Sequence, residues 1–143
     1  MLMSVTGPII VVDDDLDDQL LVYKAVEELG ITNKCIFYDK CSFAMEYLRV
    51  TTDKPLIIIS DINLPEQSGI EFKRQLDSDP FLRMKSIPFV FLSTSADKSA
   101  VTKAYNELTI QGFFQKASTY TEFKNLIKQI VEYWKSCKHP NSF

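Results

Sequence analysis

The stretch IIVVDDDLDDQLL, residues 9–21, joins four β-branched residues directly to five aspartates within six positions. A short run that is apolar at every position is typical of a strand covered on both faces, as in a parallel sheet. Aspartates that precede a helix act as N-caps and complement its dipole. Like charges so close together also repel one another, so capping alone does not explain why five of them gather at the end of a buried strand.

Short apolar runs alternate along the chain with segments of helical period, which are apolar along one face only. The order is strand then helix, five times. It predicts a doubly wound α/β fold with a five-stranded parallel sheet and helices on both faces. The stretch 77–88 is expected to be one extended loop. The expected strands are 9–12, 35–38, 56–59, 89–92 and 112–114, and the helical stripes span 21–29, 43–48, 72–76, 101–108 and 123–134.

The composition indicates one ordinary globular domain, with 143 residues and a net charge of −3. This mild negative charge argues against nucleic-acid binding. Cys35, Cys41 and Cys137 form no CxxC pair, and the single histidine, His139, lies near the C-terminus. We therefore expect free thiols and no zinc site. No segment has the pattern of a signal peptide or a membrane span, so we expect a soluble, cytoplasmic protein.

Polar side chains follow four of the five expected strands. In an open α/β sheet, ligands bind outside the carboxyl ends of the strands, at a topological switch point. Taken singly, each residue has a structural explanation as a helix cap, a turn residue or a solvated charge. Their joint placement at one edge of the sheet has no such explanation. The residues are Asp13, Asp14 and Asp15 after the first strand, Ser60 and Asp61 after the third, Ser93, Thr94 and Ser95 after the fourth, and Gln115 and Lys116 after the fifth.

These residue types point to a cation and a phosphoryl group. Carboxylates from two strands, with a backbone carbonyl nearby, make a hard oxygen site suited to Mg²⁺. A lysine and a hydroxyl opposite the metal can hold the remaining oxygens of a phosphoryl group. An aspartate can itself accept phosphate, as in aspartyl-phosphate ATPases. Part of the acidic cluster is therefore expected to bind a cation.

The chain resembles the receiver domain of response regulators in two-component signalling. The resemblance rests on the acidic pair after the first strand, on SDINLPEQSG after the third, on a hydroxyl after the fourth and on a lysine after the fifth. It implies the flavodoxin-like fold typified by CheY. It spans Pro8 to Lys135, and we expect the domain at residues 8–136, with an extension at 1–7 and a tail at 137–143.

The resemblance implies that Asp61 is the phosphoacceptor, with Ser93 bonding the phosphoryl oxygen and Lys116 pairing with it. Phe113 matches the aromatic switch position of the family, although core packing on the fifth strand explains this residue equally well. The family usually has a proline in a cis peptide after the lysine, where this chain has Ala117. A cis bond to a non-proline residue costs about 2.5–4 kcal/mol, so either the site enforces it or the loop differs.

The resemblance also implies a site for Mg²⁺, or Mn²⁺, on the acidic pair and Asp61. Asp14 is then the direct ligand, Asp13 acts through water, and Asn63 gives its main-chain carbonyl. The other aspartates of the opening stretch match no catalytic position, and we interpret them as caps and solvated charge. They are Asp15, Asp17 and Asp18.

The function implied by the resemblance is that of a stand-alone receiver and not of an enzyme. A sensor histidine kinase or a His-phosphotransfer protein would phosphorylate it. Slow self-hydrolysis, at a rate set by Asn63 and Ser95, would return it to the resting state. The signal would pass through the face built by the fourth helix, fifth strand and fifth helix to a protein that the sequence does not identify. We expect a monomer or weak homodimer, and stretch 78–88 is similar to that of phytochrome-associated receivers.

Three other functions remain open on the sequence. A phosphatase of the haloacid dehalogenase type also uses an aspartate after a strand, but it needs a second one two positions on, where this chain has Asn63. A flavodoxin-like nucleotide or flavin binder would share the architecture, yet the aspartates after the first strand would repel phosphate. An interaction module that works without phosphorylation is the third.

Overall fold

The computed structural model describes residues 3–138 and residue 140. Its strands are all parallel and form one sheet in the order β2-β1-β3-β4-β5. The predicted doubly wound α/β fold is therefore confirmed, with the reversal of strand order at β1 and β3. The strands are β1 (Ile9–Val12), β2 (Cys35–Tyr38), β3 (Ile57–Ser60), β4 (Phe89–Ser93) and β5 (Gly112–Gln115).

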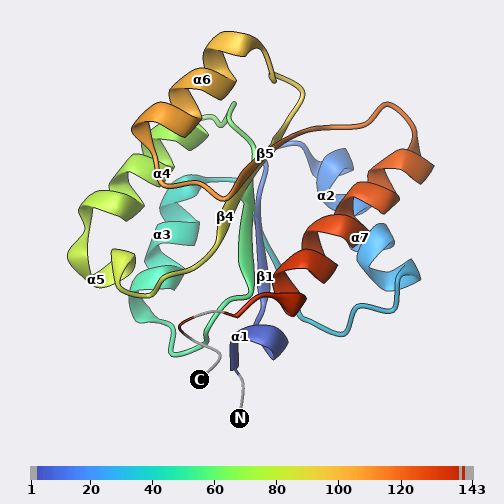
Figure 1. The fold of residues 1–143 in the computed structure, drawn as a ribbon, viewed down its shortest axis with the longest axis horizontal. Helices are drawn as coiled ribbons and strands as arrows, with labels where there is room; N and C mark the ends of the chain where they lie inside the picture. Colours follow the sequence, from blue (N-terminus) through green and yellow to red (C-terminus); the bar gives the residue numbers. More distant parts are fainter. Residues whose placement is uncertain (1–2, 139, 141–143) are drawn as a thin grey trace.

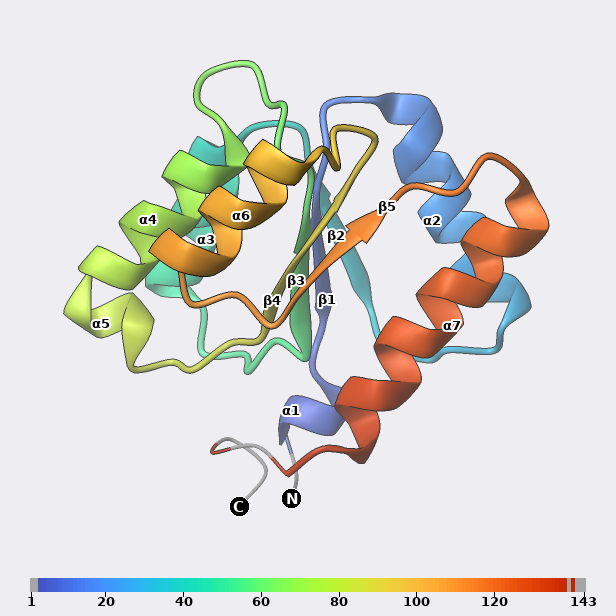
Figure 2. The same ribbon diagram turned by 45° about the horizontal axis from the view of Figure 1, so that its top comes forward.

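Helices cover both faces of the sheet, as predicted. Figures 1 and 2 show α2 and α7 on one face and α3, α4, α5 and α6 on the other, with α1 beside the end of α7. Among the described residues, none of these helices combines the length and apolar character needed to cross a membrane. Their bounds are α1 (Met3–Thr6), α2 (Leu16–Glu28), α3 (Cys41–Val50), α4 (Gly69–Ser78), α5 (Pro80–Arg83), α6 (Lys98–Glu107) and α7 (Tyr120–Ser136).

The central strands are apolar throughout because each of their faces is covered. Along β1, Ile9 and Val11 pack with α2 and α7, whereas Ile10 and Val12 pack with α3 and α4. All four are buried. The edge strand β2 differs, since its residues are only half-buried. Full burial of an apolar run thus marks the strands in the middle of the sheet.

The prediction of one extended loop over residues 77–88 is wrong. Helix α4 continues to Ser78, and α5 follows after a single residue. That residue, Asp79, caps α5 by accepting hydrogen bonds from the backbone N–H groups of Phe81 and Leu82, and Pro80 takes the first helical position. An aspartate followed by proline is a standard start signal for a helix, so the sequence did contain the information.

Two aromatic residues expected on buried helical stripes are exposed. Phe43 in α3 is 49% exposed and Tyr105 in α6 is 53% exposed. The buried face of α3 is shifted relative to the predicted stripe, because it consists of Cys41, Ala44, Met45 and Leu48. The buried face of α6 is narrower than predicted, because within this helix only Ala104 is fully buried. The ammonium of Lys40 lies 5.7 Å from the Phe43 ring centroid, which partly covers this exposed ring.

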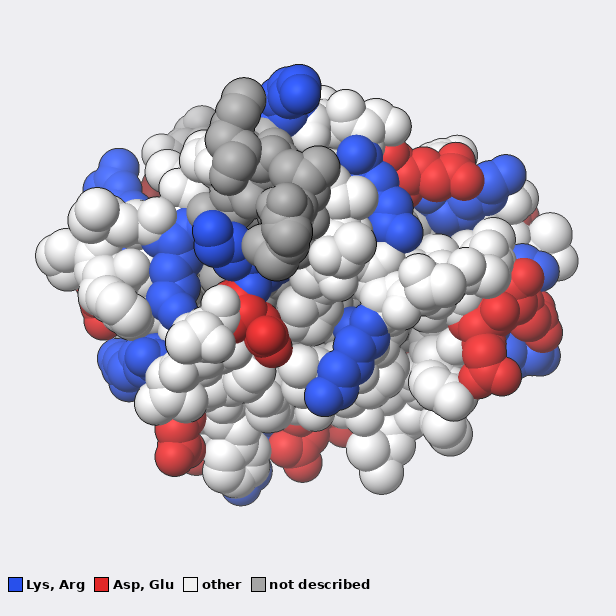
Figure 3. Space-filling view, turned by 90° about the horizontal axis from the view of Figure 1, so that it is seen from below, with Lys and Arg blue, Asp and Glu red and all other residues white. Residues whose placement is uncertain are grey.

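The carboxyl ends of the strands meet at one end of the molecule, the upper end in Figures 1 and 2. Figure 3 looks at the opposite end. On the described part of that face, lysine and arginine side chains are interspersed with acidic and uncharged ones and form no continuous basic patch.

Candidate functional site

Three carboxylates come together where β1 and β3 end. The two strands are neighbours in register, with Val12 beside Ser60, so the residues that follow them, Asp13 and Asp61, lie side by side. Oxygen atoms of Asp13, Asp14 and Asp61 all lie within 4.8 Å of one another. Asp13 and Asp61 are buried, whereas Asp14 is exposed. The group therefore opens to solvent on the side of Asp14.

The two oxygens of Asp61 have different surroundings. Oδ1 accepts hydrogen bonds from the backbone N–H groups of Ile62 at 2.6 Å and Asn63 at 3.2 Å, and from the Ser93 hydroxyl at 2.7 Å. Oδ2 accepts from the Lys116 ammonium at 2.9 Å. The hydroxyl and the lysine predicted after the fourth and fifth strands are thus both in contact with Asp61. Strands β4 and β5 each extend one residue beyond the prediction, so that Ser93 is the last residue of β4 and Gln115 the last of β5.

Lys116 is nearly enclosed by carboxylates. Its side chain is 8% exposed, and its ammonium lies 2.8 Å from Asp13 and 2.6 Å from Asp18 as well as beside Asp61. Burial alone would lower the pKa of Lys116, but the hydrogen bonds to these carboxylates outweigh it and raise the pKa. At Asp13 burial dominates and raises the pKa of the carboxyl, despite the contact with Lys116. One ammonium therefore faces three carboxylates, and the fully ionised site carries excess negative charge.

The remaining aspartates of the opening stretch do not share one role. Asp15 is the N-cap of α2, as predicted, because its carboxylate accepts from the backbone N–H groups of Asp17 and Asp18. Asp17 is exposed. The interpretation of Asp18 as solvated charge is wrong, since it pairs with Lys116. Asp18 lies four residues before the buried Val22, so it shares the sheet-facing side of α2, and that spacing was the signal in the sequence.

The side chains of Asn63 and Ser95 are joined by a hydrogen bond beside the site. The Asn63 side-chain amide donates to the Ser95 hydroxyl at 2.6 Å. Ser95 in turn belongs to the loop after β4, and its backbone N–H donates to the Ser93 hydroxyl at 3.2 Å. The segments that follow β3 and β4 are therefore linked by the side chains of two residues whose backbone N–H groups donate to Asp61 and to Ser93.

Phe113 lies on β5, half-buried against the core on the α6 side. Its ring centroid is 5.6 Å from that of Phe91, and the planes are inclined by 48°. No peptide bond within the described residues is cis, which includes Lys116–Ala117. The backbone N–H of Lys116 donates to the carbonyl of Ser93 at 3.0 Å, so the loop after β5 stays close to the end of β4.

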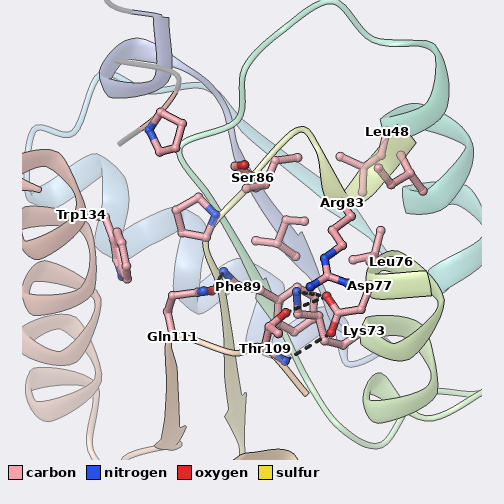
Figure 4. Close-up of a pocket in the computed structure, with 15 residues that line it drawn as sticks. Leu48, Lys73, Leu76, Asp77, Arg83, Ser86, Phe89, Thr109, Gln111 and Trp134 are labelled. Atoms are coloured by element: carbon pink, nitrogen blue, oxygen red, sulfur yellow. Dashed lines mark hydrogen bonds and ion pairs between the residues drawn. The ribbon is translucent and has the colours of Figure 1, made fainter. Parts of the chain in front are cut away.

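Within the described residues, a cavity lies at the amino ends of β4 and β5, far from the carboxylates of Asp13 and Asp61. Its volume is about 380 Å³. Figure 4 shows Lys73, Asp77 and Thr109 joined by hydrogen bonds at its wall, with Trp134 on the opposite side. Lys73 is buried and its ammonium lies 5.3 Å from the Phe89 ring centroid. This polar group joins α4 to the segment before β5, and no pattern in the sequence predicted it.

The fold and the acidic edge together define a receiver domain. The chain belongs to the response regulator receiver domain family, whose model matches residues 9–128. This match confirms the resemblance and identifies the chain as a signalling domain of two-component systems.

Individual response regulators are also similar to this chain in sequence or in structure. Response regulator Rcp1 of Synechocystis sp. strain PCC 6803 is 27% identical over 131 residues, which cover 88% of this chain and 87% of Rcp1. The protein named "Probable methanogenesis regulatory protein FilR2", of Methanothrix harundinacea, is 27% identical over 130 residues, 88% of this chain and 82% of that protein. The phosphorylated cyanobacterial phytochrome response regulator RcpA has a similar structure, with a TM-score of 0.84 at 28% identity, over 94% of this chain and 98% of RcpA.

Proposed function

We propose that this receiver domain accepts a phosphoryl group on Asp61 from a phosphohistidine of a sensor histidine kinase or a phosphotransfer protein. The main support is the convergence of two donors on one carboxylate, Ser93 on Oδ1 and Lys116 on Oδ2. A hydroxyl and an ammonium in these positions can follow the oxygens of a group that arrives at Asp61. The relative RcpA has been solved in a phosphorylated form, which also supports the proposal.

In the proposed step, a carboxylate oxygen of Asp61 forms a bond to phosphorus while the bond between phosphorus and the donor imidazole nitrogen breaks. The imidazole leaves and takes a proton from solvent. Ser93 and Lys116 donate hydrogen bonds to the oxygens of the phosphoryl group during the transfer. No histidine of this chain is needed, and His139 lies outside the described residues.

A divalent cation, Mg²⁺ or Mn²⁺, is the proposed cofactor. The donors fit, because three carboxylates with oxygens within 4.8 Å of one another make a hard oxygen site. Asp13, Asp14, Asp61 and the main-chain carbonyl of Asn63 would hold it. When bound, it neutralises charge on the transferred group. Rcp1 has been solved in a Mn²⁺-bound form, with a TM-score of 0.81 at 25% identity over 94% of this chain and 99% of Rcp1.

Phosphorylation is proposed to act on the face of α6, β5 and α7. The new phosphate adds roughly 1.5–2 negative charges, and these draw Ser93 and Lys116 away from their contacts with the bare carboxylate. Ser93 ends β4, and the loop that follows it leads to α6. Phe113 on β5 packs against Phe91 of the same strand as Ser93, so rearrangement of β4 is passed to this face. A partner that binds the rearranged face more tightly detects the phosphate.

The structure also offers a docking surface for the phosphodonor. Leu16, Leu20 and Tyr23 are 66%, 65% and 52% exposed, and their spacing places them along one exposed side of α2. Leu16 begins this helix, directly after Asp15. Apolar side chains that stand in a row in solvent are typical of an interaction site. We propose that the donor protein binds this row and thereby brings its phosphohistidine to Asp61.

The proposal is tested by the intact mass of the protein after incubation with acetyl phosphate, with and without Mg²⁺. We expect an adduct of one phosphoryl group that depends on Mg²⁺ and is absent from Asp61→Asn. The same variant should retain the fold, as measured by circular dichroism, because Asn keeps the size of the side chain. Persistent labelling of Asp61→Asn would place the acceptor elsewhere.

A melting curve with Mg²⁺ distinguishes a site that binds the cation without accumulating an adduct from a site that binds no cation. Binding at ten times the Kd should raise the free energy of unfolding by about 1.4 kcal/mol. Stabilisation by Mg²⁺ without an adduct would mean fast hydrolysis or a strict requirement for the natural donor. If Mg²⁺ produced neither stabilisation nor an adduct, the phosphoacceptor function would be refuted. A module that works by binding alone would then be favoured.

A further inference from the structure

A third carboxylate, that of Asp18, contacts the Lys116 ammonium beside the two that belong to the cation group. Nζ of Lys116 lies 2.6 Å from Oδ2 of Asp18, compared with 2.8 Å for Asp13 and 2.9 Å for Asp61. An ammonium has three N–H donors, so each carboxylate can receive one. Asp18 is not part of the cation group of the described residues, which consists of Asp13, Asp14 and Asp61.

Lys116 and a bound cation compete for the same carboxylates. Asp13 and Asp61 each accept a hydrogen bond from Nζ, and both belong to the cation group. A divalent cation there weakens both contacts, because positive charges repel at close range. A buried ammonium that loses its acceptors is strongly disfavoured, and the Lys116 side chain is only 8% exposed. The contact with Asp18 is the one that the cation leaves intact.

We propose that Asp18 is a positioning residue, which holds the Lys116 ammonium while a divalent cation occupies the carboxylates of Asp13 and Asp61. By giving the displaced ammonium an acceptor, Asp18 raises the affinity of the site for the cation. It acts through Lys116 and contributes no ligand itself. This inference deepens the proposed function and rests on its cation site.

The first turn of α2 provides a matched control. Asp17 has the same charge as its neighbour Asp18 and lies in the same turn, but its side chain is exposed. Within the described part of the chain, the ion pairs of Lys116 are with Asp13, Asp18 and Asp61, and not with Asp17. Asp17→Asn therefore removes one acidic charge near the site without changing the contacts of the ammonium.

The test measures Mg²⁺ affinity directly, by calorimetric titration of the full chain with MgCl2. We expect Asp18→Asn to bind Mg²⁺ about tenfold more weakly than the wild type, the lower end of what the loss of an outer-shell partner costs a metal site. Asp17→Asn should change the affinity less than about twofold, since an exposed charge is screened by salt. Asp18→Glu, which restores the carboxylate, should recover most of the affinity and also shows that loss in Asp18→Asn does not reflect misfolding.

A double-mutant cycle with Lys116→Met identifies the route of the effect. In this background there is no ammonium to hold, so adding Asp18→Asn should change the Mg²⁺ affinity no more than Asp17→Asn does in the wild type. An equal tenfold loss in both backgrounds would show that Asp18 acts on the cation directly and would overturn the proposal. Wild-type affinity in Asp18→Asn would overturn it as well. Wild-type protein that gains neither a Mg²⁺-dependent phosphoryl adduct nor stabilisation by Mg²⁺ would instead refute the proposed function.

Discussion

Replacing Gly69 by alanine tests how the segment that follows Asp61 is held. Gly69 begins α4, and its backbone N–H donates to the carbonyl of Ile62 at 2.6 Å. A Cβ at this position would lie 2.1 Å from the main-chain oxygen of Asp61, 3.0 Å from Cα of Ile62 and 3.0 Å from Cε1 of Phe91. A main-chain oxygen cannot rotate aside as a side chain can, so either α4 or the backbone of Asp61 must move.

The required movement sets the size of the effect. Contacts of a real Cβ are essentially never shorter than 3.0 Å, so the shift is about 0.9 Å, the difference between 3.0 and 2.1 Å. Overpacking of this kind lowers the free energy of unfolding by about 1–3 kcal/mol. A displacement close to 1 Å in a reacting group can reduce a rate by about 100-fold. We expect both effects in Gly69→Ala, measured by urea denaturation and by the rate of labelling with acetyl phosphate.

Gly30→Ala separates the loss of stability from the loss of reactivity. Gly30 follows α2 with φ of 70°, and a Cβ added to it would meet no heavy atom within 4 Å. Alanine there costs about 1–2 kcal/mol through backbone conformation alone, and the site is untouched. We therefore expect Gly30→Ala to lose comparable stability yet label at the wild-type rate. Equal labelling rates in the two variants would refute the argument that Gly69 allows α4 to position Asp61.

Two further predictions concern charge and docking. Burial raises the pKa of Asp13 above its unfolded value of 3.8, so its stabilising contribution is complete below that pH and is lost as pH rises through the raised pKa. In EDTA, Asp13→Asn should thus gain stability relative to the wild type as pH rises above about 4, as measured by urea denaturation; the opposite slope would show that Lys116 outweighs burial. Leu20→Ser should slow phosphorylation by a phosphohistidine protein about tenfold without slowing labelling by acetyl phosphate, and equal losses with both donors would contradict the docking row.

Much of the fold could be predicted because its strongest local signals agree with the global structure. The strand Ile9–Val12 and residues 89–92 are covered on both faces and are apolar for that reason. The helices alternate with these strands, and the topology rules then leave few arrangements. Short elements were harder to predict, since α5 has only four residues and no hydrophobic period can be recognised over a single turn. Its start depends on one cap, Asp79 before Pro80.

The site could be predicted in its composition but not in its contacts. The rule that ligands bind beyond the carboxyl ends of strands brings Asp13, Asp61 and Lys116 to one edge. It does not tell which carboxylates a long lysine side chain reaches. Asp18 comes from the first turn of a helix, and its contact with Lys116 spans 98 positions of the chain. The spacing from the buried Val22 places Asp18 on the sheet-facing side of α2. Which side chain it reaches there depends on how α2 is tilted against the sheet, and no local pattern encodes that tilt.

The crowding of aspartates after β1 is tolerated because the residues have different counterparts. Asp15 is paired with the backbone N–H groups at the start of α2, Asp18 with Lys116, and Asp17 with solvent. Only Asp13 and Asp14 remain in the cation group with Asp61. Burial raises the pKa of Asp13 despite its contact with Lys116, so the ammonium does not fully offset the cost of burying this carboxylate. We therefore expect affinity for a divalent cation to depend on the contact between Asp18 and Lys116, because that contact allows the ammonium to give up the carboxylates of Asp13 and Asp61.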